Sequence, residues 1–151
     1  MKHRVVAIAA IILLTLSGAT SAQASEVGLH PDVEYALEAV PGGQVVDPYT
    51  VVWPELGMEL TVPNPRARSV GSCATGTYCA YSEADGNGTR LSFGVCTTVS
   101  TSALTIVRSV ANARASGNVQ ARTGTGAVVA TVVAGTRLNV PSTVRSLRCS
   151  L

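Results

Sequence analysis

The four cysteines are the residues of this chain with the clearest chemistry. Cys73, Cys79 and Cys96 lie close together, and Cys149 lies near the C-terminus. In an oxidising compartment, four cysteines form two disulfides, for which three pairings are possible. We favour a bridge between Cys73 and Cys79, because the intervening residues include Gly76 and close a small loop easily. The second bridge would then be Cys96–Cys149, which ties this region to the end of the chain and constrains the unfolded state.

The remaining side chains give little basis for catalysis. His30 is the only histidine after His3, and zinc usually needs several nitrogen or sulfur ligands together. Glu83 and Asp85 stand at a turn without the companion groups that glycoside chemistry needs. Residues 85–88 lack the following helix of a phosphate loop and the ligand spacing of an EF-hand. We therefore expect no enzyme, no metal ion and no other cofactor.

The first 24 residues predict a signal peptide. A positively charged start is followed by an apolar run at residues 5–16, and Ala22-Gln23-Ala24 forms a small-x-small cleavage site. A membrane anchor is the alternative, but this run is shorter than the roughly 20 residues that span a bilayer. We expect cleavage after Ala24, a secreted, extracellular protein and no stable membrane insertion.

Residues 25–62 predict a small acidic unit with one helix and a β-hairpin. Residues 31–40 carry apolar side chains at helical spacing, and residues 58–62 alternate as in a half-buried strand. Such a unit is too thin to be stable alone, so we expect Trp53 to pack between it and whatever it rests on. Residues 63–71 predict a linker, in which Arg68 marks a processing site that would release the unit like a propeptide; an intact connector is the alternative.

The charges of the mature chain separate into two segments. Residues 25–65 contain seven acids and no Lys or Arg, whereas residues 66–151 contain nine arginines and two acids. Opposite charges favour docking of the acidic segment on the basic one. The alternative is that both are merely solvated surfaces.

Residues 72–151 predict a disulfide-stapled β domain. The expected strands are 77–82, 89–93, 104–111, 118–122, 127–133 and 144–149. Short strands at this spacing, separated by Gly, Ser and Asn, predict a sandwich or barrel. Residues 107–110 are echoed by residues 144–147, which indicates two similar β motifs in one domain.

The sequence Cys-Ala-Thr-Gly-Thr-Tyr-Cys-Ala-Tyr-Ser at residues 73–82 resembles the opening of the small actinobacterial metalloproteinase inhibitors. The resemblance covers residues 72–149. It implies a mainly β protein whose β-sandwich is βγ-crystallin-like, with two Greek-key motifs. Two features depart from the family. Residues 122–136 lack the second short-range disulfide of the inhibitory loop, and no Asn or acid precedes Ser109 or Ser146 as it does in calcium-binding modules.

These observations lead to the hypothesis of a secreted protein inhibitor of extracellular proteases. The resemblance points to metalloproteases as partners. A rigid loop inserted in a protease cleft loses little entropy on binding. The candidate contact residues are Ala74, Thr75, Gly76, Thr77, Ala84, Asp85, Gly86, Asn87 and Gly88.

The alternative is a cell-surface, cell-wall-binding or toxin-like module without enzymatic activity. Seven arginines lie between Arg90 and Arg148, and they could meet anionic envelope polymers or lipids. A structural role without a specific ligand is a third hypothesis. We expect no nucleic-acid partner, because the mature chain is neutral overall and its aromatic residues are few. We expect a monomer.

Overall fold

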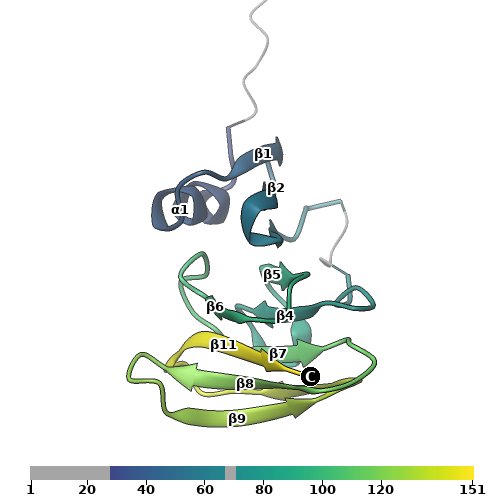
Figure 1. Cartoon of the computed structure of the whole chain (residues 1–151). Helices are drawn as coiled ribbons and strands as arrows, with labels where there is room; N and C mark the ends of the chain where they lie inside the picture. Colours follow the sequence, from purple (N-terminus) through teal and green to yellow (C-terminus); the bar gives the residue numbers. More distant parts are fainter. Residues whose placement is uncertain (1–27, 67–70) are drawn as a thin grey trace, which may run out of the picture.

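The computed structural model describes residues 28–66 and 71–151, which form a mainly β protein with one helix and two antiparallel sheets (Figure 1). The expected signal peptide with its cleavage site at Ala24, and the expected processing site at Arg68, lie outside these residues. Within the described ranges, no helix has the length and apolar character needed to cross a membrane.

Seven strands form the larger sheet, and four form the smaller one. In spatial order, the larger sheet contains β1 (Gln44–Asp47), β2 (Thr50–Trp53), β3 (Met58–Thr61), β5 (Arg90–Phe93), β4 (Tyr78–Tyr81), β7 (Ser109–Asn112) and β10 (Thr136–Asn139). The smaller sheet contains β6 (Thr98–Ser100), β11 (Val144–Ser150), β8 (Asn118–Thr123) and β9 (Val128–Val133). The remaining elements are α1 (Pro31–Ala39) and the short 3-10 helices η1 (Pro54–Leu56) and η2 (Ala84–Gly86).

The start of helix α1 follows from its sequence. Pro31 occupies the first turn, where no backbone N–H is needed, and the ring nitrogen Nδ1 of His30 accepts a hydrogen bond from the Asp32 amide at 3.2 Å. Val33 and Ala36 are fully buried on the side of α1 that packs on β2. The predicted helix is therefore confirmed, one residue shorter than expected.

Trp53 of β2 connects the end of α1 to the larger sheet. Its indole Nε1 donates a hydrogen bond to the Val40 carbonyl oxygen at 2.8 Å, and the side chain is only 2 % exposed. Trp53 also lies opposite Met58 on β3, which in turn lies opposite Phe93 on β5. It is a packing residue in the row of side chains that connects the acidic unit to the rest of the protein.

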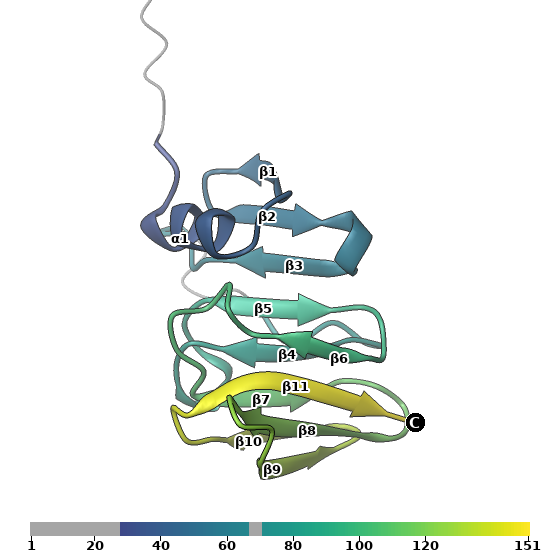
Figure 2. The same cartoon turned by 60° about the vertical axis from the view of Figure 1, so that its left-hand side comes forward.

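The acidic unit continues the sheet of the β domain. Strand β3 pairs with β5 over four residue pairs, and Figure 2 shows β1, β2, β3 and β5 in succession. A buried apolar row runs without a break through both parts of the chain. Its members are Val51, Leu60, Leu91, Ala80 and Val110. The two parts share one core as well as one sheet.

Charge contributes less to this docking than the sequence predicts. Among the described residues, one ion pair forms, between Arg90 Nη2 and Glu59 Oε1 at 3.4 Å. Arg90 Nη2 also donates to Thr61 Oγ1 at 3.2 Å, and Thr89 Oγ1 donates to Asp32 of α1. The acidic segment does dock on the basic one, but backbone pairing and apolar burial provide most of the contact.

Strands β4 to β7 form a first set of four in the β domain, and strands β8 to β11 form a second set. The two sets have the same arrangement of strands. The larger sheet contains the order β5-β4-β7-β10, and the smaller sheet contains β9-β8-β11-β6. In each set the third strand, β6 or β10, lies in the sheet of the other set. Ser109 pairs with Tyr81, and Ser146 pairs with Arg122. The echoed residues therefore occupy matching positions in the two sets.

The strand expected at residues 104–111 is wrong over most of its length. Only β7 is extended there, and the chain before it turns, with the Leu104 amide donating to the Thr101 carbonyl at 2.9 Å. Leu104 and Val107 are buried even though they lie in this crossing segment. Their apolar pattern reflects contacts with the core and does not mark a strand. The mostly polar strands β6 and β10 were not expected.

Candidate functional site

Both disulfides join the cysteines that the sequence favours. Cys73 bonds to Cys79 with a Cα–Cα distance of 5.8 Å, and Cys96 bonds to Cys149 with a Cα–Cα distance of 5.0 Å. Two disulfides in a small domain indicate an oxidising environment of the extracellular type.

The first candidate loop is a tight turn inside the Cys73–Cys79 ring. The Thr77 amide and the Thr77 hydroxyl both donate to the Ala74 carbonyl, at 3.0 and 2.7 Å. Gly76 has a φ of +84°, which the turn requires at this position and which other residues rarely adopt. Ala74, Thr75 and Gly76 are exposed. The loop therefore presents three uncharged residues to solvent.

The turn is also held from outside the ring. The Gly76 amide donates to the Ala113 carbonyl at 2.9 Å, and the Ala113 amide donates to the Thr77 carbonyl at 3.0 Å. Arg114 Nη1 donates to the Gly76 carbonyl at 3.1 Å. These contacts fix residues 74–77 against the segment that follows β7. A disulfide and three hydrogen bonds together leave the turn little freedom.

The second candidate loop, residues 84–88, folds back onto the larger sheet. The Gly86 amide donates to Ser109 Oγ at 2.9 Å, and Ser109 Oγ donates to the Glu83 carbonyl at 2.8 Å. Asp85 adopts a φ of 58°, and its amide donates to Asn139 Oδ1 at 2.8 Å. Asn139 Nδ2 returns a bond to Asp85 Oδ1 at 3.0 Å. The amides of Asp85 and Gly86 are thus turned toward β7 and β10.

The structure does not bring the two candidate loops together. Residues 74–77 precede β4 and residues 84–88 follow it, so the loops lie at opposite ends of this strand. Ala84, Asp85 and Asn87 are exposed, and Gly86 and Gly88 are half-buried.

The side chains considered for catalysis have separate structural roles. His30 caps α1 and lies beside Tyr49, with ring centroids 5.9 Å apart. Glu83 and Asp85 belong to the folded loop. Within residues 28–66 and 71–151, no three His, Cys, Asp or Glu side chains gather in a group that could hold a metal ion.

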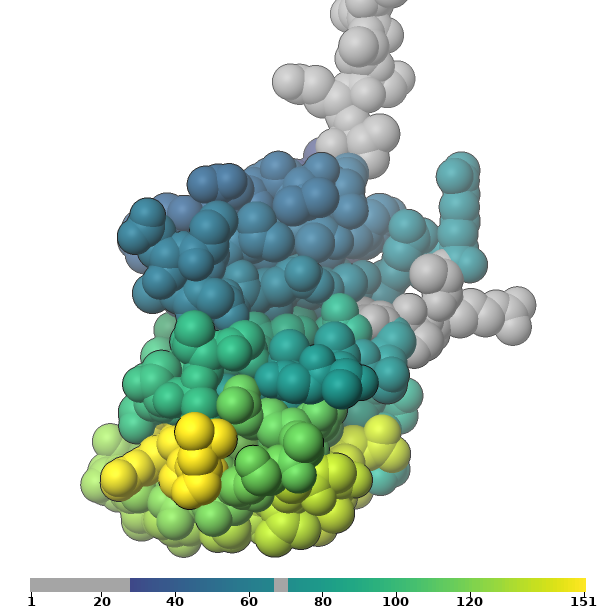
Figure 3. Space-filling model, turned by 45° about the vertical axis from the view of Figure 1, so that its right-hand side comes forward, coloured from purple at the N-terminus to yellow at the C-terminus, as the bar shows by residue number. Residues whose placement is uncertain are grey.

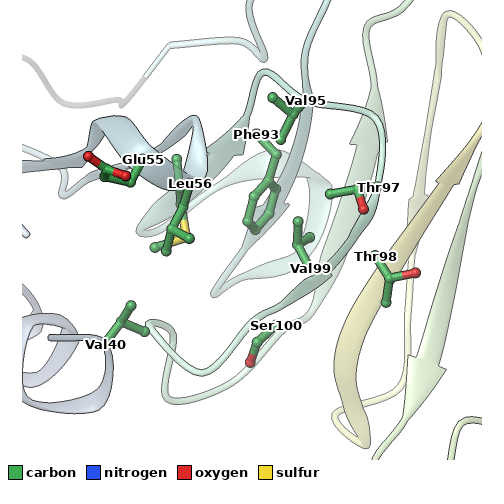
Figure 4. A pocket seen from close by; sticks show the side chains of 10 residues that line it. Val40, Glu55, Leu56, Phe93, Val95, Thr97, Thr98, Val99 and Ser100 are labelled. Atoms are coloured by element: carbon green, nitrogen blue, oxygen red, sulfur yellow. The ribbon is translucent and has the colours of Figure 1, made fainter. Parts of the chain in front are cut away.

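An apolar groove between the acidic unit and the β5–β6 segment was missed by the sequence analysis. It has a volume of about 340 Å³, and Figure 4 shows Leu56, Phe93, Val95 and Val99 around it. Leu56 is 48 % exposed and Val95 is 47 % exposed. The lining comes from segments far apart in the chain, and no local pattern could have joined them.

Two buried tyrosines support the strands beside the first loop. Burial raises the pKa of the Tyr78 phenol above its ordinary value, although a hydrogen bond to Thr97 and the charge of Arg114 oppose the shift. Tyr78 Oη donates to the carbonyls of Val95 and Thr97 at 3.0 and 3.2 Å. Burial likewise raises the pKa of Tyr81, against the opposing charge of Arg90. Both phenols are kept neutral inside the protein.

Comparisons with known protein families, with curated proteins and with solved structures find no match. The geometry of the loops and surfaces and the chemistry of their residues are therefore the basis for the function proposed below.

Proposed function

We propose that the protein is a secreted inhibitor of an extracellular protease, in particular a metalloprotease, and that it presents residues 74–77 to the protease cleft. The observation that carries the proposal is the disulfide-closed, hydrogen-bonded and exposed turn at these residues. A loop held in one conformation loses little conformational entropy on binding, so more of its contact energy remains as affinity.

The proposal includes the fold of residues 72–151. The strand orders β5-β4-β7-β10 and β9-β8-β11-β6 support a βγ-crystallin-like sandwich of two Greek-key motifs, each of which sends its third strand into the other sheet. The resemblance of residues 73–82 to the opening of the metalloproteinase inhibitors supports the same assignment. The helix-plus-hairpin unit is an addition to that fold.

Residues 74–77 are the primary contact in this proposal, and residues 84–88 are the secondary one. The amides of Asp85 and Gly86 are already bonded to Asn139 and Ser109, so they are not available to a protease. Asp85 and the neighbouring Glu83 also bring negative charge to that loop. The turn at residues 74–77 carries no charge, and three of its four residues are exposed.

The inhibitor acts by fitting against its partner, as a monomer and without catalysis or a cofactor. His30, the one histidine of the described residues, has its Nδ1 occupied by the Asp32 amide. The hydroxyl of Ser109 is buried and bonded on both sides to the folded loop. These groups have structural tasks and do not form a nucleophile–base pair.

A protease panel tests the proposal. The chain from residue 25 to residue 151 is titrated against thermolysin and subtilisin at micromolar concentration. Inhibition of thermolysin is expected. A Thr75→Arg variant should weaken it about tenfold or more, because the larger charged side chain stands in the proposed contact. The matched control is Thr105→Arg at an exposed position between β6 and β7, which should inhibit as the unmodified chain does.

Two results would contradict the proposal. One is that neither protease is inhibited at micromolar concentration. The other is that Thr75→Arg and Thr105→Arg have the same effect, which would leave residues 74–77 without a special role. The whole mature chain is the correct material, because a fragment that lacks residues 25–66 would lose the pairing of β3 with β5.

A further inference from the structure

The outer face of the four-stranded sheet gathers arginine, hydroxyl and amide side chains. Side chains alternate along a strand, and Val119, Ala121 and Leu147 point into the core. Their neighbours along β8 and β11 therefore point to solvent. The residues of the outward rows are Thr98, Ser100, Asn118, Gln120, Arg122, Val128, Thr131, Val133, Ser146, Arg148 and Ser150.

Two arginines of this face are close neighbours. Arg148 lies opposite Gln120, and Arg122 lies opposite Ser146, so the two arginines are diagonal partners on adjacent strands. Diagonal positions in a sheet are roughly 7 Å apart. Arg145 is exposed at the irregularity of β11 between Val144 and Ser146. It directly precedes Ser146, which belongs to the outward row of β11.

The guanidinium groups of Arg122 and Arg145 are held by hydrogen bonds and keep spare donors. Arg122 Nη2 donates to Gln120 Oε1 at 2.7 Å, which uses one of the five N–H donors of the guanidinium. Arg145 Nη1 donates to the carbonyls of Ser142 and Val144, at 2.9 and 2.8 Å. Held cations with unused N–H groups are suited to receive an anion.

No Asp or Glu side chain lies on this sheet. All four strands fall within residues 97–151, which contain no Asp or Glu. The described acids lie in the acidic unit and in the loop that follows β4, and Figure 3 shows the acidic unit and the C-terminal strands at opposite ends of the molecule. The one ion pair of the described residues uses Arg90 on the other sheet. The face therefore presents positive charge without an Asp or Glu side chain as counter-ion.

We propose that this face binds a linear polyol phosphate, a flexible chain of hydroxylated units joined by phosphodiesters. Arg122, Arg145 and Arg148 would pair with successive phosphates, since a guanidinium binds two phosphate oxygens at once. Hydroxyls and amides such as Ser146 and Gln120 match the hydroxyl groups between phosphates. This binding is separate from protease inhibition, because none of its residues belongs to residues 74–77 or 84–88.

The composition of the face selects this polymer over other polyanions. The last aromatic residue of the sequence is Phe93, so the sheet offers no ring on which nucleic-acid bases could stack. Its exposed apolar side chains are the valines of β9, Val128, Val129 and Val133, and the outward rows lack the Trp, Phe or Leu of an interfacial membrane anchor. A flexible chain of phosphates and hydroxyls needs neither kind of contact.

The test measures binding of the whole mature chain to immobilised poly(glycerol phosphate). Binding is expected at low salt and should weaken as salt rises, because phosphate contacts release counter-ions. The double variant Arg122→Gln/Arg148→Gln should lose about tenfold or more in affinity. The matched control is Arg66→Gln/Arg108→Gln, which changes the net charge equally at exposed arginines away from this sheet and should lose clearly less.

Three outcomes would overturn the inference. The first is no binding to poly(glycerol phosphate) at low salt. The second is equal loss in the two double variants, which would show attraction to overall charge alone. The third is equal or tighter binding to single-stranded DNA or to phosphatidylglycerol vesicles. Circular dichroism and the inhibition assay, which should be unchanged in both variants, distinguish a failed surface from a failed fold or a failed inhibitor.

Discussion

Leu60 of β3 lies directly opposite Leu91 of β5, and both side chains are fully buried. This contact joins the acidic unit to the β domain in the middle of the larger sheet. Removal of the unit would uncover the edge of β5 and the apolar row behind it. An exposed edge of this kind is a template for pairing with other chains.

The first prediction concerns this contact. Leu60→Ala should lower the free energy of unfolding by about 2–5 kcal/mol, because it opens a cavity in the shared core. Urea denaturation followed by Trp53 fluorescence and by circular dichroism measures the loss. Leu56→Ala is the control, since Leu56 is 48 % exposed and should cost less than about 1 kcal/mol. Separate transitions for the two probes would contradict a single cooperative core.

The second prediction concerns the anchor of residues 84–88. Ser109→Ala removes the hydroxyl that bonds both the Gly86 amide and the Glu83 carbonyl. Loss of these bonds should cost about 1–3 kcal/mol and speed hydrogen exchange of the Gly86 amide. Ser116→Ala, at an exposed position, is the control and should change neither quantity. Unchanged exchange at Gly86 in the Ser109 variant would show that the loop is held by other contacts.

The third prediction compares the two disulfides. Replacing Cys96 and Cys149 by Ala should cost about 4 kcal/mol, because that bridge closes a loop with a sequence separation of 53. Replacing Cys73 and Cys79 should cost only about 2 kcal/mol, since their separation is 6. Inhibition should follow the opposite order if residues 74–77 form the contact. Greater loss of inhibition in the Cys96/Cys149 variant, measured while it is still folded, would count against that contact.

The fourth prediction concerns alkaline pH. Burial raises the pKa values of Tyr78 and Tyr81 above the ordinary value of 10.0. The folded protein therefore holds these phenol protons more tightly than the unfolded chain. The resulting stability is fully present below about pH 10 and is lost as pH rises through the folded values. Urea denaturation at neutral and alkaline pH should show this fall, and Tyr78→Phe should make it shallower. A steeper or unchanged fall in that variant would contradict the assignment.

Much of the local structure follows from short-range rules. Pro31 and the apolar spacing after it predict α1, and the alternation after Met58 predicts β3. Cys73 and Cys79 can form a bridge with little constraint from the rest of the fold. Each of these features depends on residues that are near one another in the sequence.

The long-range pairings could not be predicted in the same way. No property of residues 58–62 indicates that β3 pairs with β5. The choice of partner depends on which strand edge of the β domain is left free by the rest of the fold. Leu104 and Val107 belong to a segment whose apolar residues alternate as in a strand. That segment crosses between strands instead of forming one, and its two apolar side chains are buried in the core. The groove beside Leu56 and the arginine face around Arg122 form only when distant strands align.

The exchange of third strands between the two sheets has a consequence for how the protein acquires its native state. Strand β6 can be seated only after β11, the last strand of the chain, has arrived beside it. The two motifs are interlocked, so neither can complete its own sheet in isolation. Pairings so distant in sequence slow folding. Because Cys96 lies two residues before β6 and Cys149 lies in β11, closure of this bridge would report the final step of assembly.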